Sequence, residues 1–175
     1  FHDRAEKFDW VFFACHSDEA LKLIKSPTQD EKNTLRAIPY TDNEVILHYD
    51  ESFMPKRKLA WAAWNYVRAE NEQQESSSVC LHYLLNKLQP LPYSQAVVVS
   101  LNPTQTIDPK KIIQTIDYAH PVFDLPAIDA QQHLHQIQGQ QHTWYAGAWL
   151  GYGFHEDGLK SGLSVARELL KRVNA

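Results

Sequence analysis

The apolar and polar positions near the start of the chain follow a strand pattern and then a helix pattern. Trp10–Cys15 is a short run of apolar residues, which predicts a strand buried on both of its faces. Glu19–Ile24 then has helical spacing, with Ser17 or Asp18 as its predicted N-cap and a proline just after its end. A second short helix is predicted over residues 30–37.

The middle of the chain is rich in β-branched and aromatic residues, which favour strands. Polar or proline-bearing turns separate five predicted strands: Asn43–Tyr49, Leu59–Val67, Val79–Leu85, Ala96–Leu101 and Ile112–Tyr118. The segment 81–89 also has spacing that fits a helix, although a strand followed by a turn is favoured. The polar run 68–78 predicts a solvated, mobile loop.

The last part of the chain predicts a helix, a strand and a long helix. A helix is expected over residues 126–137, closed by Gly139, and a strand over residues 143–147. In the last helix Asp157 is the predicted N-cap, with Glu156 beside it. One face is predicted to be buried and consists of Leu159, Leu163, Ala166, Leu169 and Val173. The opposite face is predicted to be solvated and consists of Lys160, Ser164, Arg167 and Lys171.

The order of these elements predicts an α+β fold in which one sheet interrupts another. The strand at residues 10–14 and the strand at 143–147 are expected to lie beside each other, far apart though they are in the sequence. The antiparallel strands between them are expected to form an inserted domain over residues 29–139, flanked by 1–28 and 140–175.

Composition and charge restrict the kinds of partner and location. The net charge is −4, from 17 basic and 21 acidic residues. The sequence contains no stripe of basic residues, so nucleic-acid binding is not predicted. No apolar run approaches the roughly 20 residues of a membrane span. Two cysteines are too few for a disulfide framework or a zinc site, and a cytoplasmic location is the default expectation. No metal site is predicted from the histidines His133, His135, His142 and His155, because a spacing of two separates helical side chains.

Small residues recur every four positions in the last helix, at Gly158, Gly162 and Ala166. Glycine in a helix costs about 1 kcal/mol relative to alanine, so something is expected to lie close to this backbone. Tight packing of the helix on the sheet and close approach of a ligand both fit the pattern.

The segment 143–166 resembles the C-terminal FAD motif of flavin-containing amine oxidases and related desaturases. In that motif Ala-Gly at the end of a strand precedes a glycine-rich turn and a helix with Ser-Gly and a later Ala. Nearly the whole chain is similar, in the same order, to a bacterial-type set of predicted NAD/FAD-binding oxidoreductases. The phrases that carry this similarity are Phe8–Ser17, Ile38–Asn43, Leu47–Asp50, Trp61–Tyr66, His120–Phe123 and Gly151–Gly158.

The resemblance implies a cofactor site for FAD, with no metal. It assigns flavin contacts to the end of the first strand, the turn after the later strand and the start of the last helix: Ala14, Cys15, Gly147, Ala148, Trp149, His155, Glu156, Asp157, Gly158 and Leu159. An aromatic substrate pocket is expected from Trp64, Tyr66, Trp149 and Tyr152. Ala148 stands where amine oxidases usually carry an acidic residue, and no catalytic residue is assigned.

The resemblance also implies the activity: an FAD-dependent oxidoreductase that oxidises a small amine or apolar substrate by hydride transfer to flavin. All six glycines lie from Gly139 onward, so the Gly-x-Gly-x-x-Gly dinucleotide motif is not in this sequence. We therefore expect the C-terminal part of a longer flavoprotein, whose partner is the missing N-terminal FAD-binding half. Alone it should be inactive and should not hold FAD tightly.

Residues 1–28 and 140–175 would then belong to an FAD/NAD(P)-binding α/β domain, and residues 29–139 would form its antiparallel substrate domain. The alternative is a cofactor-free binding or scaffolding module that retains the flavoprotein fold.

Overall fold

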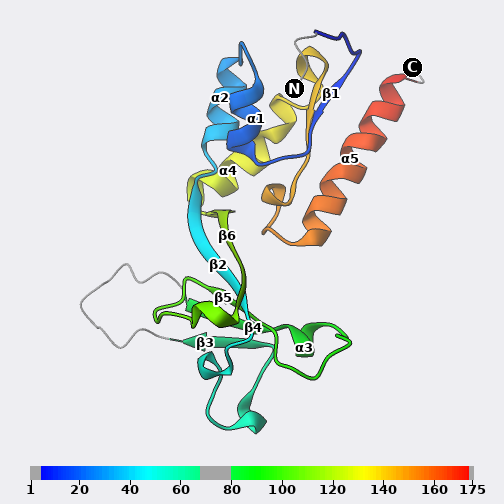
Figure 1. Cartoon of the computed structure of the whole chain (residues 1–175). Coiled ribbons are helices and arrows are strands. Elements are labelled where there is room, and N and C mark those ends of the chain that lie inside the picture. Colours follow the sequence, from blue (N-terminus) through cyan, green and yellow to red (C-terminus); the bar gives the residue numbers. More distant parts are fainter. Residues whose placement is uncertain (1–4, 68–79, 174–175) are drawn as a thin grey trace. The chain divides into compact units, whose positions relative to one another are not determined.

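The computed structural model describes residues 5–67 and 80–173, which divide into two compact units (Figure 1). The segments up to Thr41 and from Pro121 onward form the terminal unit. The segment Asp42–His120 forms the central unit. Helices, a five-stranded sheet and a small parallel sheet together confirm the predicted α+β class.

The terminal unit is organised around two short strands from opposite ends of the sequence. β1 (Val11–Phe13) pairs in parallel with β7 (Thr143–Tyr145), with Val11 opposite Thr143 and Phe13 opposite Tyr145. The predicted adjacency of these two distant segments is therefore confirmed. α1, α2 and α4 lie on one side of the strand pair and α5 lies on the other (Figure 1).

The helices of the terminal unit begin at capping residues. α1 (Ser17–Leu23) has His16 as its N-cap, whose backbone N–H donates to Glu19, so neither predicted cap residue is the cap. α2 (Gln29–Arg36) begins with a capping box between Thr28 and Glu31. In α4 (Leu125–His133) the Asp124 carboxylate accepts from the N–H of Ala127. These helices share one core, composed of Ala20, Leu35, Ile38, Ala127, Ile137, Tyr145 and Trp149.

Two predictions of burial in this unit are wrong. β1 is predicted to be buried on both faces, but Val11 and Phe12, whose side chains lie on opposite faces, are 42% and 48% exposed, because a sheet of two strands offers little cover on either face. In α5 (His155–Val173) the expected inner residues Leu159, Leu163, Ala166 and Val173 are exposed. The helix instead turns Val165 inward, with Ser161 and Leu169 half-buried on the same side.

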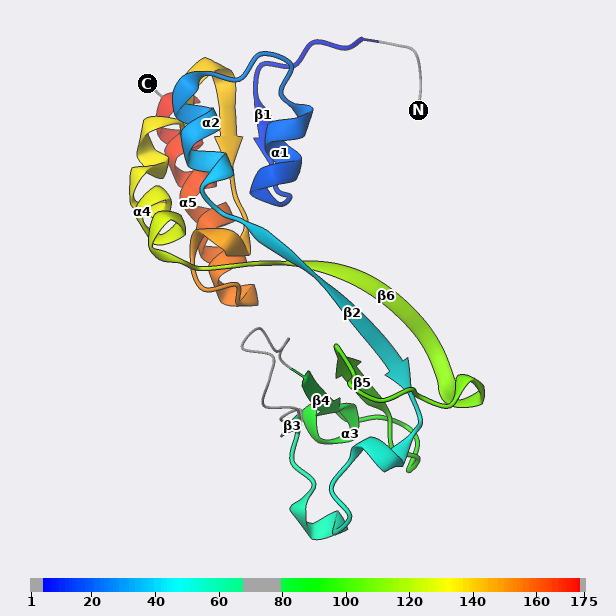
Figure 2. The same ribbon diagram turned by 90° about the vertical axis from the view of Figure 1, so that its left-hand side faces the viewer.

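The central unit contains a five-stranded sheet in the order β3-β4-β5-β2-β6. Its β2–β5, β3–β4 and β4–β5 pairs are antiparallel. Figure 2 shows the two longest strands, β2 and β6, side by side. The strands are β2 (Tyr40–His48), β3 (Trp64–Val67), β4 (Cys80–Leu84), β5 (Val98–Leu101) and β6 (Ile112–Pro121).

Local structure in the central unit refines the predicted strands. A 3-10 turn at Lys58–Ala60 delays β3, so the strand predicted from Leu59 begins only at Trp64. β4 leads directly into the short helix α3 (Leu85–Leu88), so the strand and helix alternatives for this segment each describe one part of it. The apolar core is small and consists of Met54, Leu84, Ala96 and Val98.

The boundaries of the units differ from the predicted ones at 28/29 and 139/140. α2 and α4 were assigned to the inserted segment but belong to the terminal unit, because Leu35 and Ala127 pack into the core around Tyr145. The predicted polar loop at 68–78 lies outside the described residues. None of the helices in the described ranges combines the length and apolarity needed to cross a membrane.

Candidate functional site

The candidate site lies where the chain leaves β1 and β7 at their carboxyl ends. The N–H of Ala146 donates to the carbonyl of Phe13, and the indole N–H of Trp149 donates to the carbonyl of Cys15 at 3.0 Å. A side chain at Gly147 would place its Cβ 2.5 Å from Trp149 Nε1, so only glycine fits there. These contacts join the two turns that follow the paired strands.

Ser161 connects α5 to the turn after β7 by hydrogen bonds. Its hydroxyl accepts from the N–H of Gly147 at 3.0 Å and lies 2.8 Å from the carbonyl oxygen of Gly158. The sequence prediction did not assign Ser161 to the site, although its Ser-Gly pair is part of the motif. Ser161 therefore helps to hold this face of α5 toward the sheet, together with Arg172, which donates to the carbonyl of Gly139 at 2.8 Å.

The first turn of α5 differs from its prediction. The helix begins at His155, so Asp157 is its third residue and not the N-cap. The Asp157 carboxylate reaches back and accepts from the N–H groups of Tyr152 and Phe154, both at 3.0 Å. Because this oxygen is already shared by two donors, Asp157 serves the preceding turn, where its negative charge also suits the helix N-terminus.

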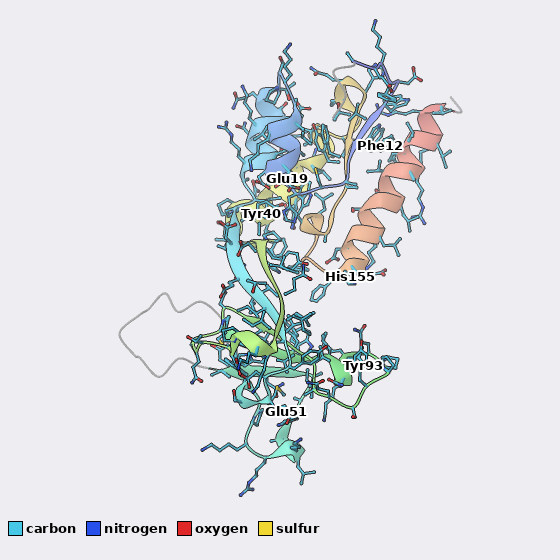
Figure 3. All side chains as sticks on the ribbon, viewed as in Figure 1. Phe12, Glu19, Tyr40, Glu51, Tyr93 and His155 are labelled. Carbon is cyan, nitrogen blue, oxygen red and sulfur yellow. The ribbon has the colours of Figure 1, made fainter. Side chains whose placement is uncertain are left out.

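The two residues before Asp157 are open to solvent. The exposed His155 side chain extends from the start of α5 (Figure 3), and Glu156 forms an exposed ion pair with Lys160 at 3.7 Å. Within residues 5–67 and 80–173, the backbone N–H groups of His155 and Glu156 have no hydrogen-bond acceptor. The N–H groups of Asp157 and Gly158 both donate to the carbonyl of Phe154.

The small residues of α5 are not explained by packing in the described part of the chain. A Cβ at Gly158 would make an ordinary contact, 3.7 Å from the backbone nitrogen of Ala148. A Cβ at Gly162 would meet no atom within 4 Å. Packing of α5 on its own sheet therefore does not require glycine at Gly158 or at Gly162. The surface of α5 beside Gly162 is open.

The predicted cofactor residues are partly brought together. Cys15, Gly147, Ala148, Trp149 and Gly158 meet through the contacts above, and Ala14 directly precedes Cys15. His155, Glu156 and Asp157 lie on the first turn of α5, and Leu159 follows them with its side chain exposed. Burial raises the pKa of the Cys15 thiol, and the nearby Glu19 raises it further, so this cysteine is a poor nucleophile.

The four residues of the predicted substrate pocket lie in different units. Trp64 and Tyr66 are on β3, with exposed side chains on the same face of the strand. Trp149 is only 3% exposed and belongs to the core of the terminal unit, and Tyr152 is exposed beside Phe123. An aromatic pocket made of all four residues is therefore not formed within either unit.

The sequence analysis missed a buried polar cluster in the central unit. Ser100 Oγ lies 2.7 Å from His48 Nε2 and 2.7 Å from His82 Nδ1. His48 Nδ1 accepts from the N–H of Asp50 at 3.0 Å, and His82 Nε2 lies 3.6 Å from Cys80 Sγ. The available signal was a polar residue at an inward position of otherwise apolar strands, since side chains alternate between the two faces.

The direction of this hydrogen-bond chain follows from counting protons. His48 Nδ1 accepts, so the neutral ring carries its proton on Nε2 and donates to Ser100. The described residues offer the buried Ser100 hydroxyl no acceptor other than His82 Nδ1, so it donates there, which places the His82 proton on Nε2, facing Cys80. His82 therefore donates toward the sulfur and is unable to accept a proton from the thiol in this state.

The surroundings of the cluster keep both rings neutral. Burial lowers the pKa of His48 to about 4 against the opposing charge of Asp50, with His82 and Lys111 lowering it further. Burial also lowers the pKa of His82. For Asp50, burial alone would raise the pKa, but hydrogen bonds from Lys111 and Ser52 outweigh it and bring the value to about 2.

His82 also lines a cavity of about 330 Å³ on the central unit, together with Phe53, Met54, Asn65 and Tyr66. In the part of the chain that the structure describes, no group of three or more His, Cys, Asp or Glu side chains could hold a metal ion.

No known protein-family model matches the chain, and no curated protein is significantly similar to it.

Proposed function

We propose that this chain is the C-terminal, cofactor-facing part of an FAD-dependent oxidoreductase of amine-oxidase type. The observation that supports it best is the parallel pairing of β1 with β7, whose carboxyl ends lead into Cys15 and the Gly147 turn. Ligands of parallel sheets bind outside the carboxyl ends of the strands. Five of the predicted FAD residues, Cys15, Gly147, Ala148, Trp149 and Gly158, meet at that end.

The strand pair offers one open edge to a further strand. On β7, the side-chain amide of Gln138 donates to the carbonyl of Tyr145 and accepts from its N–H, which occupies the outer edge. On β1, the carbonyl of Phe13 faces β7, so the backbone groups of Phe12 point away from it. Parallel sheets are normally larger and covered on both faces. The missing N-terminal FAD-binding half would supply the next strand.

The exposed face of α5 supports the same proposal. Leu159, Leu163, Leu170 and Val173 are between 44% and 64% exposed, and they follow one another on one side of the helix. Single exposed apolar residues are normal, but a continuous row on a long helix is typical of a surface that another element covers. Covering this row would also enclose the open space beside Gly162.

The residues at the start of α5 fit the flavin. The resemblance assigns the N1/C2-carbonyl end of the ring to the amides near Asp157, Gly158 and Leu159, but the N–H groups of Asp157 and Gly158 donate to Phe154. The N–H groups of His155 and Glu156 would take this place, where the helix N-terminus favours negative charge by about 0.3–1 kcal/mol. Gly158 and Ala148 would leave room for the ring to approach the backbone. When bound, FAD supplies the electron-accepting ring that takes a hydride from a small amine or apolar substrate. The chain's own residues bind and orient that ring.

The visible spectrum of the full-length protein tests this function. We expect a yellow protein whose flavin absorbance bleaches when an amine or apolar substrate is added without oxygen. We expect this chain alone to bind FAD weakly and to show no turnover. A colourless full-length protein that gains no flavin on reconstitution would contradict the proposal and favour a cofactor-free binding or scaffolding module.

A further inference from the structure

The neutral hydrogen-bond chain in the central unit has one permitted arrangement of protons. It crosses three neighbouring strands, from His48 on β2 through Ser100 on β5 to His82 on β4. All three side chains are at most 2% exposed, so water is not available to replace a lost partner. The register of these strands and the state of the two rings are therefore coupled.

A proton added to either ring breaks this arrangement. On His82 the proton would go to Nδ1, and the hydroxyl proton of Ser100 would then lose its acceptor. On His48 the proton would go to Nδ1, which faces the N–H of Asp50. In each case a buried donor is left without a partner, in addition to the cost of burying a charge.

The charged groups around the rings give little compensation. Asp50 is the carboxylate closest along the chain to His48, and its Oδ1 already accepts from Lys111 at 3.0 Å and from Ser52. His82 faces Ser100 and the thiol of Cys80, and Lys56 lies on the cavity that His82 lines. Phe53 packs against both rings in a T-shaped arrangement, with centroids 5.3 Å apart in each pair.

We propose that His48, Ser100 and His82 form an acid-operated latch that holds β2, β5 and β4 together while both rings are neutral and opens when either ring is protonated. Opening exposes Cys80, which is only 2% exposed while the latch is closed. The device belongs to the central unit and does not depend on the proposed flavin chemistry.

The sign of the pH effect follows from the neutral rings. Both histidines have a lower pKa in the folded chain than the ordinary value of about 6.5 that they regain when the latch opens. Their stabilising effect is therefore complete above about pH 6.5 and is lost as the pH falls toward 4. Each histidine increases the opening constant by up to tenfold per pH unit, and the two together by up to about a hundredfold.

The test measures how fast Cys80 is labelled by 4,4′-dithiodipyridine, a thiol reagent that reacts in acid. The full chain carries Cys15→Ala, so that Cys80 is its one remaining cysteine. Between pH 6 and 4.5 we expect the opening constant to rise by more than tenfold per pH unit. His48→Gln and His82→Gln should each reduce this slope to at most tenfold. His135→Gln, an exposed histidine on the terminal unit, should leave the slope unchanged.

The opening constant is the labelling rate of Cys80 divided by its rate in the urea-unfolded chain at the same pH, because thiol reactivity itself changes with pH. An opening constant independent of pH over this range, or a slope unaltered by both glutamine variants, would overturn the proposal. If a variant fails to fold, nitrogen-15 NMR of the unsubstituted chain at pH 7 decides the question. The latch requires both rings to carry their single proton on Nε2, and an Nδ1 proton on either ring is incompatible with it.

Discussion

The terminal and central units are stabilised in opposite ways. The terminal unit buries large apolar side chains such as Trp144, Tyr145 and Trp149, yet it leaves Phe12 and one face of α5 uncovered. The central unit has a smaller apolar core and buries His48, His82 and Ser100 in a hydrogen-bonded chain. The exposed apolar residues of the terminal unit favour a partner that covers them. The buried histidine network makes the stability of the central unit depend on pH.

The largest expected effect comes from removing the buried indole of the terminal unit. Trp149→Ala should destabilise that unit by about 3–5 kcal/mol, because it leaves a cavity and removes the hydrogen bond to Cys15. The exposed Trp64→Ala on β3 is the control and should cost less than about 1 kcal/mol. Urea unfolding measures both, and equal losses would show that Trp149 is not part of a real core.

The next effect concerns the network of the central unit. Ser100→Ala leaves His48 Nε2 and His82 Nδ1 without their shared partner, at a cost of about 1–3 kcal/mol for each group. Ser94→Ala, at an exposed position, should change the free energy of unfolding by less than about 0.5 kcal/mol. A Ser100 variant as stable as the Ser94 variant would refute the polar account of this unit.

The terminal unit should also respond to acid, but over a lower range than the histidines. The buried Tyr145 hydroxyl donates to Glu31 at 2.7 Å, and this bond together with those from Thr28 outweighs burial and lowers the pKa of Glu31. This stabilisation is present above the ordinary pKa of about 4.5 and is lost as the pH falls below it.

Tyr145→Phe should therefore cost about 1.5–3 kcal/mol at pH 7 and noticeably less at pH 3. The control is Tyr152→Phe, whose side chain is 69% exposed in the same unit. Thermal unfolding at the two pH values compares them. A Tyr145→Phe penalty that is the same at both values would contradict the assigned role of Glu31.

A substitution on the exposed apolar face of α5 is expected to have the smallest effect on the stability of this chain. In the full-length protein it is expected to lower the FAD content. Leu163→Lys should change the stability of this chain by no more than about 0.5 kcal/mol, because the side chain is already exposed. In the full-length protein it should lower FAD content, measured by absorbance. Ser164→Lys adds the same charge one residue on and should retain FAD. Equal FAD content in both variants would argue against a partner on this face.

The sequence predicted most elements because short apolar runs and helical periodicity are local signals, and it predicted the pairing of β1 with β7 from the order of those elements. It did not predict which side of α5 is buried. The leucines at 159 and 163 dominate the helical pattern over Val165, but tertiary contacts fix the orientation, among them those of Ser161 with Gly147 and of Arg172 with Gly139. The sequence also placed α2 and α4 in the wrong unit, since helical periodicity does not say which core a helix joins.

The candidate site could be predicted only in part. The residues near Gly147 were found because glycine and the Ser-Gly motif mark close approaches. The role of Asp157 was not predicted, because a carboxylate at the N-cap and one at the third helical residue look alike in sequence. The His48–Ser100–His82 chain escaped prediction because its members are far apart in sequence and meet only through strand register.

The side-chain amide of Gln138 has a consequence for self-association. Because this amide occupies the backbone N–H and C=O of Tyr145 on β7, a further strand can pair with this small sheet only at β1. Growth of fibres through this small sheet would need two open strand edges, and a strand pair with one open edge can pair only once with the same edge of a second copy. Replacing Gln138 with a residue lacking the amide would restore the second end and, with it, the hazard of open-ended polymerisation.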